Sequence, residues 1–474
     1  MPDAGALLAG ISVRRSQCHG PRRARGLARR VPLDFNPDTV RRRLEGLGPA
    51  PCLLGLSGGG DSTALLLIAA GWARRQGATL IPVVIDHAIR PESAGEADRA
   101  ARRARQLGLS PAIIRWEGEK PATGLQAAAR DFRLQTFARL AHRHGAKTVL
   151  LGHTRDDQAE TVWMRLQAGG GPDALCGMAM HSALPLWPEG RGVSIYRPLL
   201  DISRAQLRAW LTEQDESWVN DPSNDNRTFT RVRNRQTLAR LAAEGFDPDA
   251  LCALSEKFRA VRTQISEAAA REIMTSMTLL GWGGVRLPPD MAVAPHALKI
   301  MDAARSAASG DPVSRPEASR RLLAAFQAGK PATAGGAALT RHREDWYLVR
   351  DPGAVSGRAD GTSDPVSFIE AGNVRIWDGR FEISGRNAQI NCLGKAYPRE
   401  ISAESLAGIP PVARPGLPLM RPPGGVAGIP GITAETGGLA KWLAPELICR
   451  NLFEDRPPAW FDMQLRDETA QGSQ

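Results

Sequence analysis

Six consecutive residues carry the clearest chemistry in the sequence: three glycines preceded by a serine and followed by an aspartate and a serine. They are Ser57, Gly58, Gly59, Gly60, Asp61 and Ser62. Glycine adopts backbone angles closed to other residues, so this turn can direct several N–H groups at one anion. The apolar runs on either side predict a strand before the turn and a helix after it, and the positive end of the helix dipole favours the same anion. The segment therefore predicts a phosphate-binding turn.

Asp61 narrows the choice of anion. A carboxylate beside a polyphosphate is stable when a divalent cation lies between them, and the hydroxyls of Ser57 and Ser62 can donate to the same phosphates. We therefore expect ATP with Mg²⁺, and Asp61 as the magnesium ligand. The segment is not a Walker A motif, because no Lys-Ser/Thr pair follows the last glycine, and its glycines lack the spacing of the dinucleotide-binding fingerprint.

Three acidic residues follow a later apolar strand: Asp156, Asp157 and Glu160. On a helix they fall within roughly 100° of arc beside an apolar stripe. Capping a helix needs only one such residue. The three acids can hold Mg²⁺ or accept the ammonium group of an amine substrate, and together with Asp61 they are the candidate catalytic residues. Helix capping alone is the alternative interpretation.

Other polar residues stand where strands are expected to end. Asp86 and His87 follow the strand 79–86, and His153 follows the strand 147–152. Ligands of open α/β sheets bind at the carboxyl ends of the strands, so we assign these three residues to ATP binding. A helix-entry turn is the alternative for Asp86 and His87.

Arginines recur on one side of predicted helices, and a positive stripe of this kind suits an RNA backbone. One pair lies three residues apart within 125–144, and three more recur every four residues from residue 227. An ordinary solvated helix face is the alternative. The candidate tRNA-binding residues are Arg130, Arg133, Arg197, Arg227, Arg231 and Arg235.

Strands and helices alternate between residues 53 and 167 in the manner of a parallel, doubly wound α/β sheet. The expected strands are 53–57, 79–86, 111–116 and 147–152, and the expected helices are 61–75, 93–107, 125–144 and 156–167. Ser203 is expected to begin a further helix that runs through Leu211.

The remainder of the chain predicts separate domains. From residue 245 to Met277 the pattern is helical, with one apolar face formed by Leu251, Leu254, Phe258, Val261 and Ile265. Beyond it the sequence is rich in Gly and Pro, with strands expected at 345–350 and 374–383 and a loop or linker at 414–424. We divide the chain into a basic, unpacked extension (1–32), an ATP-binding domain (33–222), a helical domain (223–335) and a small C-terminal α+β or β domain (336–474).

Composition agrees with an RNA partner. The 474 residues carry a formal net charge of +11, which favours binding to a polyanion. The six cysteines are scattered without a Cys-x-x-Cys pair, which argues against a zinc ribbon, an iron–sulfur site or a secreted disulfide framework. No apolar run approaches the roughly 20 residues of a membrane span. We expect a cytoplasmic protein with no membrane association.

Several segments, in this order, resemble the tRNA(Ile)-lysidine synthase family of the PP-loop ATP pyrophosphatases. They are Ser57–Ser62, Asp86–His87, Ala128–Arg133, Gly152–Thr161, Arg197–Leu200 and Asp221–Asn224. The resemblance covers about residues 50 to 240 and implies an adenine-nucleotide α-hydrolase-like domain, followed by a tRNA-facing helical domain. It does not extend clearly to the C-terminal region.

The resemblance also implies a two-step reaction on a tRNA(Ile) with a CAU anticodon. The wobble cytidine attacks the α phosphate of ATP, giving an adenylated base and pyrophosphate. Free L-lysine then attacks C2 and expels AMP, leaving lysidine. One of Asp156, Asp157 and Glu160 would orient the lysine amine and take its proton. Which of them does so stays open, as does the oligomeric state, for which a homodimer is one option.

Two other functions remain open at this point. One is a tRNA-thiolating enzyme built on the same ATP domain, although Cys176 has no cysteine partner by spacing. The other is a nucleotide-regulated RNA-binding protein without catalysis, since a fold alone does not establish activity. Asp61 and the three later acids count against the second.

Overall fold

The structure is a computed structural model. It describes residues 35–219, 230–355, 367–385, 387–430, 432–433, 439–454 and 457–461. The expected N-terminal extension, the Asp221–Asn224 motif and Arg227 lie outside these residues.

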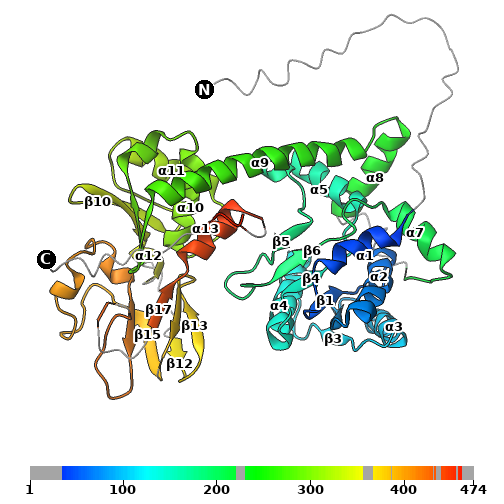
Figure 1. The fold of residues 1–474 in the computed structure, drawn as a ribbon, viewed down its shortest axis with the longest axis horizontal. Helices are drawn as coiled ribbons and strands as arrows, with labels where there is room; N and C mark the ends of the chain where they lie inside the picture. Colours follow the sequence, from blue (N-terminus) through cyan, green and yellow to red (C-terminus); the bar gives the residue numbers. More distant parts are fainter. Residues whose placement is uncertain are drawn as a thin grey trace, which may run out of the picture. The chain divides into compact units, whose positions relative to one another are not determined.

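A six-stranded sheet occupies the first part of the described chain, in the order β3-β2-β1-β4-β6-β5 (Figure 1). Neighbouring strands run parallel except at the β5 edge, where β5 and β6 are antiparallel. The strands are β1 Cys52–Gly55, β2 Leu80–Asp86, β3 Ala112–Arg115, β4 Thr148–Leu150, β5 His181–Ala183 and β6 Ser194–Tyr196. The predicted parallel α/β sheet is therefore confirmed.

Seven helices accompany these strands among the described residues, and those at 60–76, 93–106, 125–144, 155–167 and 204–213 match the expected helices to within a few residues. They are α1 Pro37–Glu45, α2 Gly60–Gln76, α3 Ser93–Gln106, α4 Leu125–His144, α5 Arg155–Gln167, α6 Pro172–Leu175 and α7 Arg204–Glu213. Ser203 caps α7 as predicted, since its hydroxyl accepts a hydrogen bond from the Gln206 amide.

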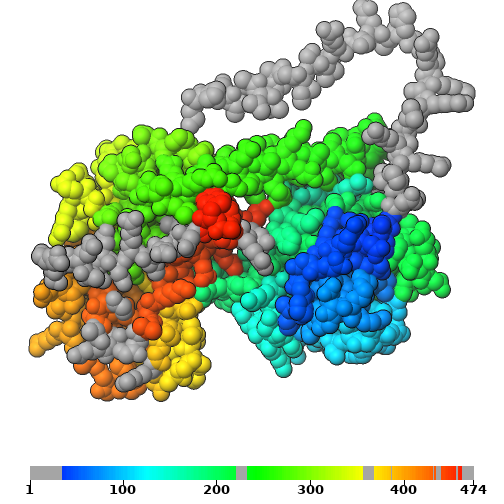
Figure 2. All heavy atoms as spheres, viewed as in Figure 1, coloured from blue at the N-terminus to red at the C-terminus, as the bar shows by residue number. Residues whose placement is uncertain are grey.

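Both faces of this sheet are covered, which explains why its strands read as continuous apolar runs. Neighbouring residues of β1 point in opposite directions. Leu54 packs in a core with α1, α2, α3 and α7, while Leu53 packs in a second core with α4. In Figure 2 the atoms of α1 and α2, in blue, cover the first of these faces.

Two helices follow, α8 Thr230–Ala243 and α9 Asp249–Ser276. The predicted apolar face of α9 is wrong in its second half. Leu251 is buried, but Val261 and Ile265 are exposed. In this half of α9 the side chains of Arg259 and Arg262 form ion pairs with Glu454, and the apolar side chains face outward.

The C-terminal part contains three antiparallel sheets, ordered β7-β8-β11-β10-β9, β12-β15-β16 and β13-β14-β17. Their strands are β7 Thr278–Leu280, β8 Gly284–Leu287, β9 Ala332–Ala334, β10 Ala337–His342, β11 Asp345–Arg350, β12 Ser367–Ile369, β13 Val374–Trp377, β14 Phe381–Ser384, β15 Ala388–Cys392, β16 Pro418–Arg421 and β17 Leu439–Trp442. The helical elements are η3 Pro289–Val293, α10 Ala297–Ser309, α11 Pro316–Gln327, α12 Pro352–Val355, η4 Glu404–Leu406, η5 Arg414–Gly416 and α13 Ala444–Leu452.

Two expectations for this part need correction. The single strand expected at 374–383 is a hairpin, because a turn at Asp378 and Gly379, both with positive φ, separates β13 from β14. The expected loop at 414–424 contains η5 and β16, and β16 pairs with β15. The strand 345–350 is confirmed as β11. The first C-terminal sheet crosses the boundary expected at residue 335, since β9 ends at Ala334 and pairs with β10.

Candidate active site

The glycine-rich turn lies at the carboxyl end of β1 and leads directly into α2. Gly58 has a φ of 82°, a conformation that favours glycine, and Gly59 precedes the helix in an extended conformation. No side chain of the described residues caps α2, so its first-turn N–H groups face the turn as an anion site requires.

The two serines shape this turn from within. The hydroxyls of Ser57 and Ser62 lie 3.0 Å apart, and the Ser62 hydroxyl donates to the Gly59 carbonyl at 3.0 Å. The segment after α7 closes the turn from outside, since the Val219 amide donates to the Gly58 carbonyl at 3.0 Å. The Trp218 ring is 3.5 Å from where a Cβ on Gly60 would stand, which is ordinary van der Waals contact, so only a side chain larger than that of alanine would have to displace the ring.

Gly152 brings the end of β4 against the start of α2. A Cβ at this position would stand 3.0 Å from the Asp61 carbonyl oxygen and 3.1 Å from its carbon. Because both are backbone atoms of a helix, neither can move aside cheaply. Gly152 thereby sets the spacing between Asp61 and the acids of α5.

A single guanidinium, that of Arg204, joins the acids of the site. Its Nε donates to Asp61 Oδ2 at 3.3 Å, one terminal nitrogen donates to Glu160 Oε1 at 2.7 Å, and the other contacts Asp157 Oδ1. The Arg204 backbone amide donates to Asp156 Oδ2 at 2.8 Å. Since Arg204 is the first residue of α7, this helix start meets the starts of α2 and α5 at one point.

The pKa values of Asp61 and Asp157 shift in opposite directions. Burial and the neighbouring Asp157 raise the pKa of Asp61, while Arg204 acts in the opposite direction. For Asp157, burial also raises the pKa, but the Arg204 guanidinium, His153 and two hydrogen bonds from Thr154 outweigh it and lower the pKa. The same carboxylates raise the pKa of Arg204 in spite of its burial. These shifts favour the charged forms of Asp157 and Arg204.

Glu160 lies deepest in the cluster and is 3% exposed. Its Oε1 also accepts from Arg235 Nε at 2.8 Å, while its Oε2 is buried without a hydrogen-bond partner among the described residues. Three carboxylates, on Asp61, Asp157 and Glu160, thus face two guanidinium groups. These carboxylates outnumber the guanidinium groups that contact them, and the charge of Arg208 also acts on Asp61.

Comparison of the sequence with known proteins identifies the family of this chain. The family model of the PP-loop domain matches residues 38–242. The chain is 36% identical over 332 residues to the tRNA(Ile)-lysidine synthase of Hyphomonas neptunium, over 68% of this chain and 88% of that protein. It is 32% identical over 393 residues to the tRNA(Ile)-lysidine synthase of Caulobacter vibrioides, over 82% of this chain and 88% of that protein. This chain belongs to the tRNA(Ile)-lysidine synthase family.

A solved structure is also similar. The U34-tRNA thiolase NcsA from Methanococcus maripaludis, with its 4Fe-4S cluster, is 17% identical and has a TM-score of 0.40, over 48% of this chain and 76% of that chain. The relatives from Hyphomonas and Caulobacter extend the lysidine synthase match beyond the PP-loop domain, into the region where the sequence motifs were faint.

The structure of this lysidine synthase family member brings most of the predicted site together. Asp61, Asp157 and Glu160 share Arg204, and His153 lies close enough to Asp157 to lower its pKa. Asp156 differs from the other acids, since its contact is to the backbone of α7. Part of the capping alternative is also true, because Asp157 and Thr154 form a capping box.

Asp86 and His87 lie at the expected sheet edge. The Asp86 carboxylate accepts from the Ala88 amide at 2.8 Å and the Ser93 hydroxyl at 2.6 Å, so it forms the helix-entry turn that was the alternative interpretation. His87 lies against the rings of Trp116 and Phe132, with centroids 6.1 and 6.5 Å away. Burial and Arg133 lower the pKa of His87, which favours the neutral imidazole.

The predicted tRNA-binding arginines divide into three groups. Arg130 is exposed on α4, and Arg133 is half-buried near His87. Arg197 is 7% exposed and donates to the Ala179 carbonyl at 2.8 Å and the Ser182 hydroxyl at 3.0 Å, so it holds the β5 edge instead of facing solvent. Arg235 contacts Glu160. The side chain of Arg231, like Arg227, lies outside the described residues.

Sequence reasoning missed Arg204 and Trp218. Arg204 follows the capping serine of α7 and is one of many arginines in the chain, so neither spacing nor composition distinguishes it. Its importance arises from the meeting of three helix starts, which only the tertiary structure shows.

The site could hold a magnesium ion through one carboxylate of the protein and oxygen atoms of the bound phosphates. In the described part of the chain, no group of three or more His, Cys, Asp or Glu residues is arranged to hold a metal ion. Magnesium is often bound by only one or two carboxylates together with substrate phosphates. Asp61, beside the glycine turn, can supply such a ligand.

Two further observations bear on the sequence predictions. Among the helices of the described residues, none is long and apolar enough to cross a membrane. Cys176, the cysteine considered for thiolation, is fully buried, and burial raises the pKa of its thiol. It is therefore poorly suited to carry sulfur.

Proposed function

We propose that this chain ligates free L-lysine to C2 of the wobble cytidine of a tRNA(Ile) with a CAU anticodon. ATP adenylates the cytidine first, and the products are lysidine, AMP and pyrophosphate. One observation carries the proposal: in a chain of this family, three carboxylates from two helices, Asp61 of α2 and Asp157 and Glu160 of α5, gather around Arg204 beside the glycine turn.

The glycine turn would bind the triphosphate and stabilise charge on the departing pyrophosphate. The start of α2 has no side-chain cap among the described residues, and the serine hydroxyls lie within the turn, so both could donate to a bound phosphate. Donors fixed in place before the reaction stabilise a developing charge at least cost. Mg²⁺ held by Asp61 would neutralise the same phosphates. His87, in its aromatic setting, and His153 would border the nucleotide.

The acids around Arg204 would hold the lysine substrate. They outnumber the two guanidinium groups that contact them, and Glu160 Oε2 is a buried acceptor without a partner among the described residues. An ammonium group satisfies both conditions. A carboxylate beside it can then accept the proton that the amine loses when it attacks C2.

The tRNA would approach over α4 and α8. Arg133 of α4 lies close enough to His87 to lower its pKa, Arg130 is exposed one turn earlier, and Arg235 places a half-exposed guanidinium at the edge of the acid cluster. Arg197 is left out of this surface because it is buried. Such a reaction belongs in the cytoplasm, where tRNA and free lysine are available.

The test is release of AMP and pyrophosphate from ATP by the purified protein. We expect turnover only when lysine and a tRNA(Ile) with a CAU anticodon are both present. Asp61→Ala should abolish turnover and leave tRNA affinity nearly unchanged, and Asp98→Ala, at an exposed position on α3, is the matched control. AMP release that needs a sulfide donor instead of lysine would favour a thiolating enzyme and contradict the proposal.

A further inference from the structure

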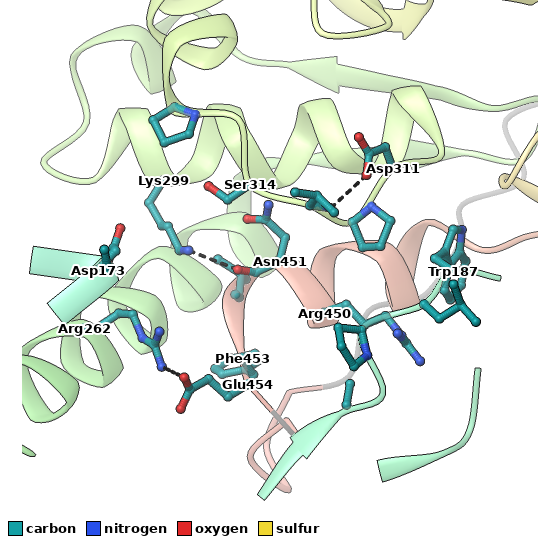
Figure 3. Close-up of a pocket in the computed structure, with 18 of the residues that line it drawn as sticks. Asp173, Trp187, Arg262, Lys299, Asp311, Ser314, Arg450, Asn451, Phe453 and Glu454 are labelled. Atoms are coloured by element: carbon teal, nitrogen blue, oxygen red, sulfur yellow. Dashed lines mark hydrogen bonds and ion pairs between the residues drawn. The ribbon is translucent and has the colours of Figure 1, made fainter. Parts of the chain in front are cut away.

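A large cavity is lined by Arg165 of α5 and by none of the residues of the acid cluster. Figure 3 shows its lining side chains. Its volume is about 840 Å³, within the range of small-molecule sites. Its wall combines α5, α6 and the β5–β6 connection with α9, α10, the segment after α10 and the end of α13. The proposed reaction makes no use of it.

Three cations in this wall have no ion pair with a carboxylate of the described residues. Arg165 donates only to the carbonyls of Ala174 and Gly177, both at 2.8 Å. Arg450 donates to the carbonyls of Leu184 and Gly190, at 3.1 and 2.8 Å. Backbone carbonyls position these cations but leave their charge unmatched.

Lys299 is the third of these cations. Its Nζ donates to the backbone carbonyl of Asn451 at 3.0 Å, and Figure 3 shows it reaching from α10 toward that residue. Burial lowers the pKa of Lys299, as it does for Arg165 and Arg450. Nearby carboxylates act in the opposite direction, Glu454 on Arg165, Asp173 and Asp302 on Lys299 and Glu446 on Arg450, but they do not outweigh burial. A further anion would therefore stabilise the positive charges of this cavity.

The acids of the same wall are largely matched already. Glu454 contacts Arg259 and Arg262, and Asp311 pairs with Arg315 at 2.7 Å. Asp173 is the remaining carboxylate of the wall, and its charge acts on Lys299. With three unmatched cations against one carboxylate, the cavity favours an anionic ligand.

A buried hydrogen-bond acceptor indicates that the ligand also carries a donor group. Asn451 is 8% exposed and lines the cavity, and its amide nitrogen donates to Asp302 Oδ2 at 3.0 Å. This contact fixes the amide orientation, so the buried Oδ1 is an acceptor, and it has no hydrogen-bond partner among the described residues. A ligand hydroxyl beside Asn451 would satisfy it.

From this juxtaposition of unmatched cations and an orphaned acceptor we propose that the cavity binds a phosphate ester that also carries hydroxyl groups, of the size of a nucleotide or sugar phosphate. Lys299 contacts the phosphate, Arg165 and Arg450 supply further positive charge, and Asn451 accepts from a hydroxyl. The ligand is either a free molecule or a nucleotide of bound RNA. This site is separate from the glycine turn and does not depend on the proposed reaction.

The experiment measures binding of ribose 5-phosphate and AMP by calorimetry, and the Lys299 variant distinguishes this cavity from the glycine turn, which that substitution leaves intact. We expect Lys299→Met to weaken binding at least about tenfold, since the substitution removes a charged hydrogen-bond donor from the phosphate. Lys257→Met, which removes an exposed lysine of α9, is the matched control and should bind as the unaltered protein does. Circular dichroism checks that both variants are folded.

The outcomes separate the two sources of the ligand. Binding of the free compounds, lost in Lys299→Met, supports a small-molecule site. No binding of either compound, but a tRNA affinity that falls about tenfold in Lys299→Met and not in Lys257→Met, supports a nucleotide of the tRNA. If neither is bound and tRNA affinity is unchanged, or if both variants behave alike, the inference is wrong. A failed lysidine assay would leave these binding results as they are.

Discussion

At the scale of single residues, the site depends on how one planar guanidinium satisfies several acids. Arg204 contacts Asp61, Asp157 and Glu160 through different nitrogens, and its side chain is only 14% exposed. A guanidinium presents its donors in a fixed fork, whereas a lysine ammonium is a single point charge. The geometry of the acids therefore requires arginine at this position and not simply a positive charge.

Arg204→Lys tests this requirement. We expect the charge to be kept but the three carboxylates to lose their common partner, with a fall in kcat/KM for lysine of at least about tenfold. Steady-state kinetics at varied lysine concentration measure it. Arg208→Lys, an exposed arginine one turn further along α7, is the control. Equal kinetics in the two variants would show that charge alone matters.

At the scale of elements, the site is made by helix starts brought against one another. Gly152 permits the closest of these approaches, between the end of β4 and the start of α2. Hydrogen bonds to Asp302 hold α10, α11 and α13 together. Its carboxylate accepts from Arg305, Ser319 and Asn451 at 2.6 to 3.1 Å. In both places a local polar or steric detail decides how whole elements pack.

Gly152→Ala should separate β4 from α2. The new Cβ would meet backbone atoms of Asp61 at about 3 Å, and we expect ATP-dependent turnover to fall at least tenfold, since small displacements of reacting groups cost about that much or more. Gly71→Ala, within α2, is the matched control, because a Cβ there meets nothing within 4 Å. Turnover unchanged by Gly152→Ala would mean that the two elements can relax.

The lowered pKa of the Asp302 carboxyl group predicts that the stability of the fold depends on pH. Burial raises the pKa of its carboxyl, but hydrogen bonds from Ser314, Ser319 and Asn451 and the charge of Arg305 lower the pKa to about 2. Because the folded pKa is depressed, the stabilisation is complete above the ordinary pKa of about 4 and is lost as the pH falls toward 2.

Asp302→Asn removes this titration. The difference in unfolding free energy between the unaltered protein and the variant should shrink by about 2 kcal/mol between about pH 5 and pH 2. Urea unfolding at a series of pH values measures it, with exposed Asp98→Asn as the control. A difference that stays constant with pH would contradict the lowered pKa.

At the scale of the whole molecule, the sheet domain is tied to the C-terminal part by the connection between β5 and β6. Trp187 Nε1 donates to the Gly379 carbonyl at 2.8 Å, and Arg191 contacts Glu382 and Glu446, the latter at 2.6 Å. Arg450 reaches back to two carbonyls of the same connection.

Arg191→Met removes the two ion pairs at the centre of this contact. The expected loss of unfolding free energy is about 1–2 kcal/mol, because the partners are partly exposed to solvent. Thermal unfolding and limited proteolysis of the 184–193 connection measure the effect. Arg143→Met, at an exposed position of α4, should change neither; an equal loss there would mean that the contact contributes nothing specific.

The sequence by itself determined the ATP domain. Continuous apolar strands, the glycine turn and the acids of α5 are local patterns, because strand burial, turn geometry and helix periodicity each involve residues close together in the chain. The tertiary structure decided the rest. Arg204 lies 143 residues from Asp61, Arg197 is buried by the β5 edge, and the α9 face turns because of Glu454. No local pattern carries such pairings, since they arise only when distant elements pack together.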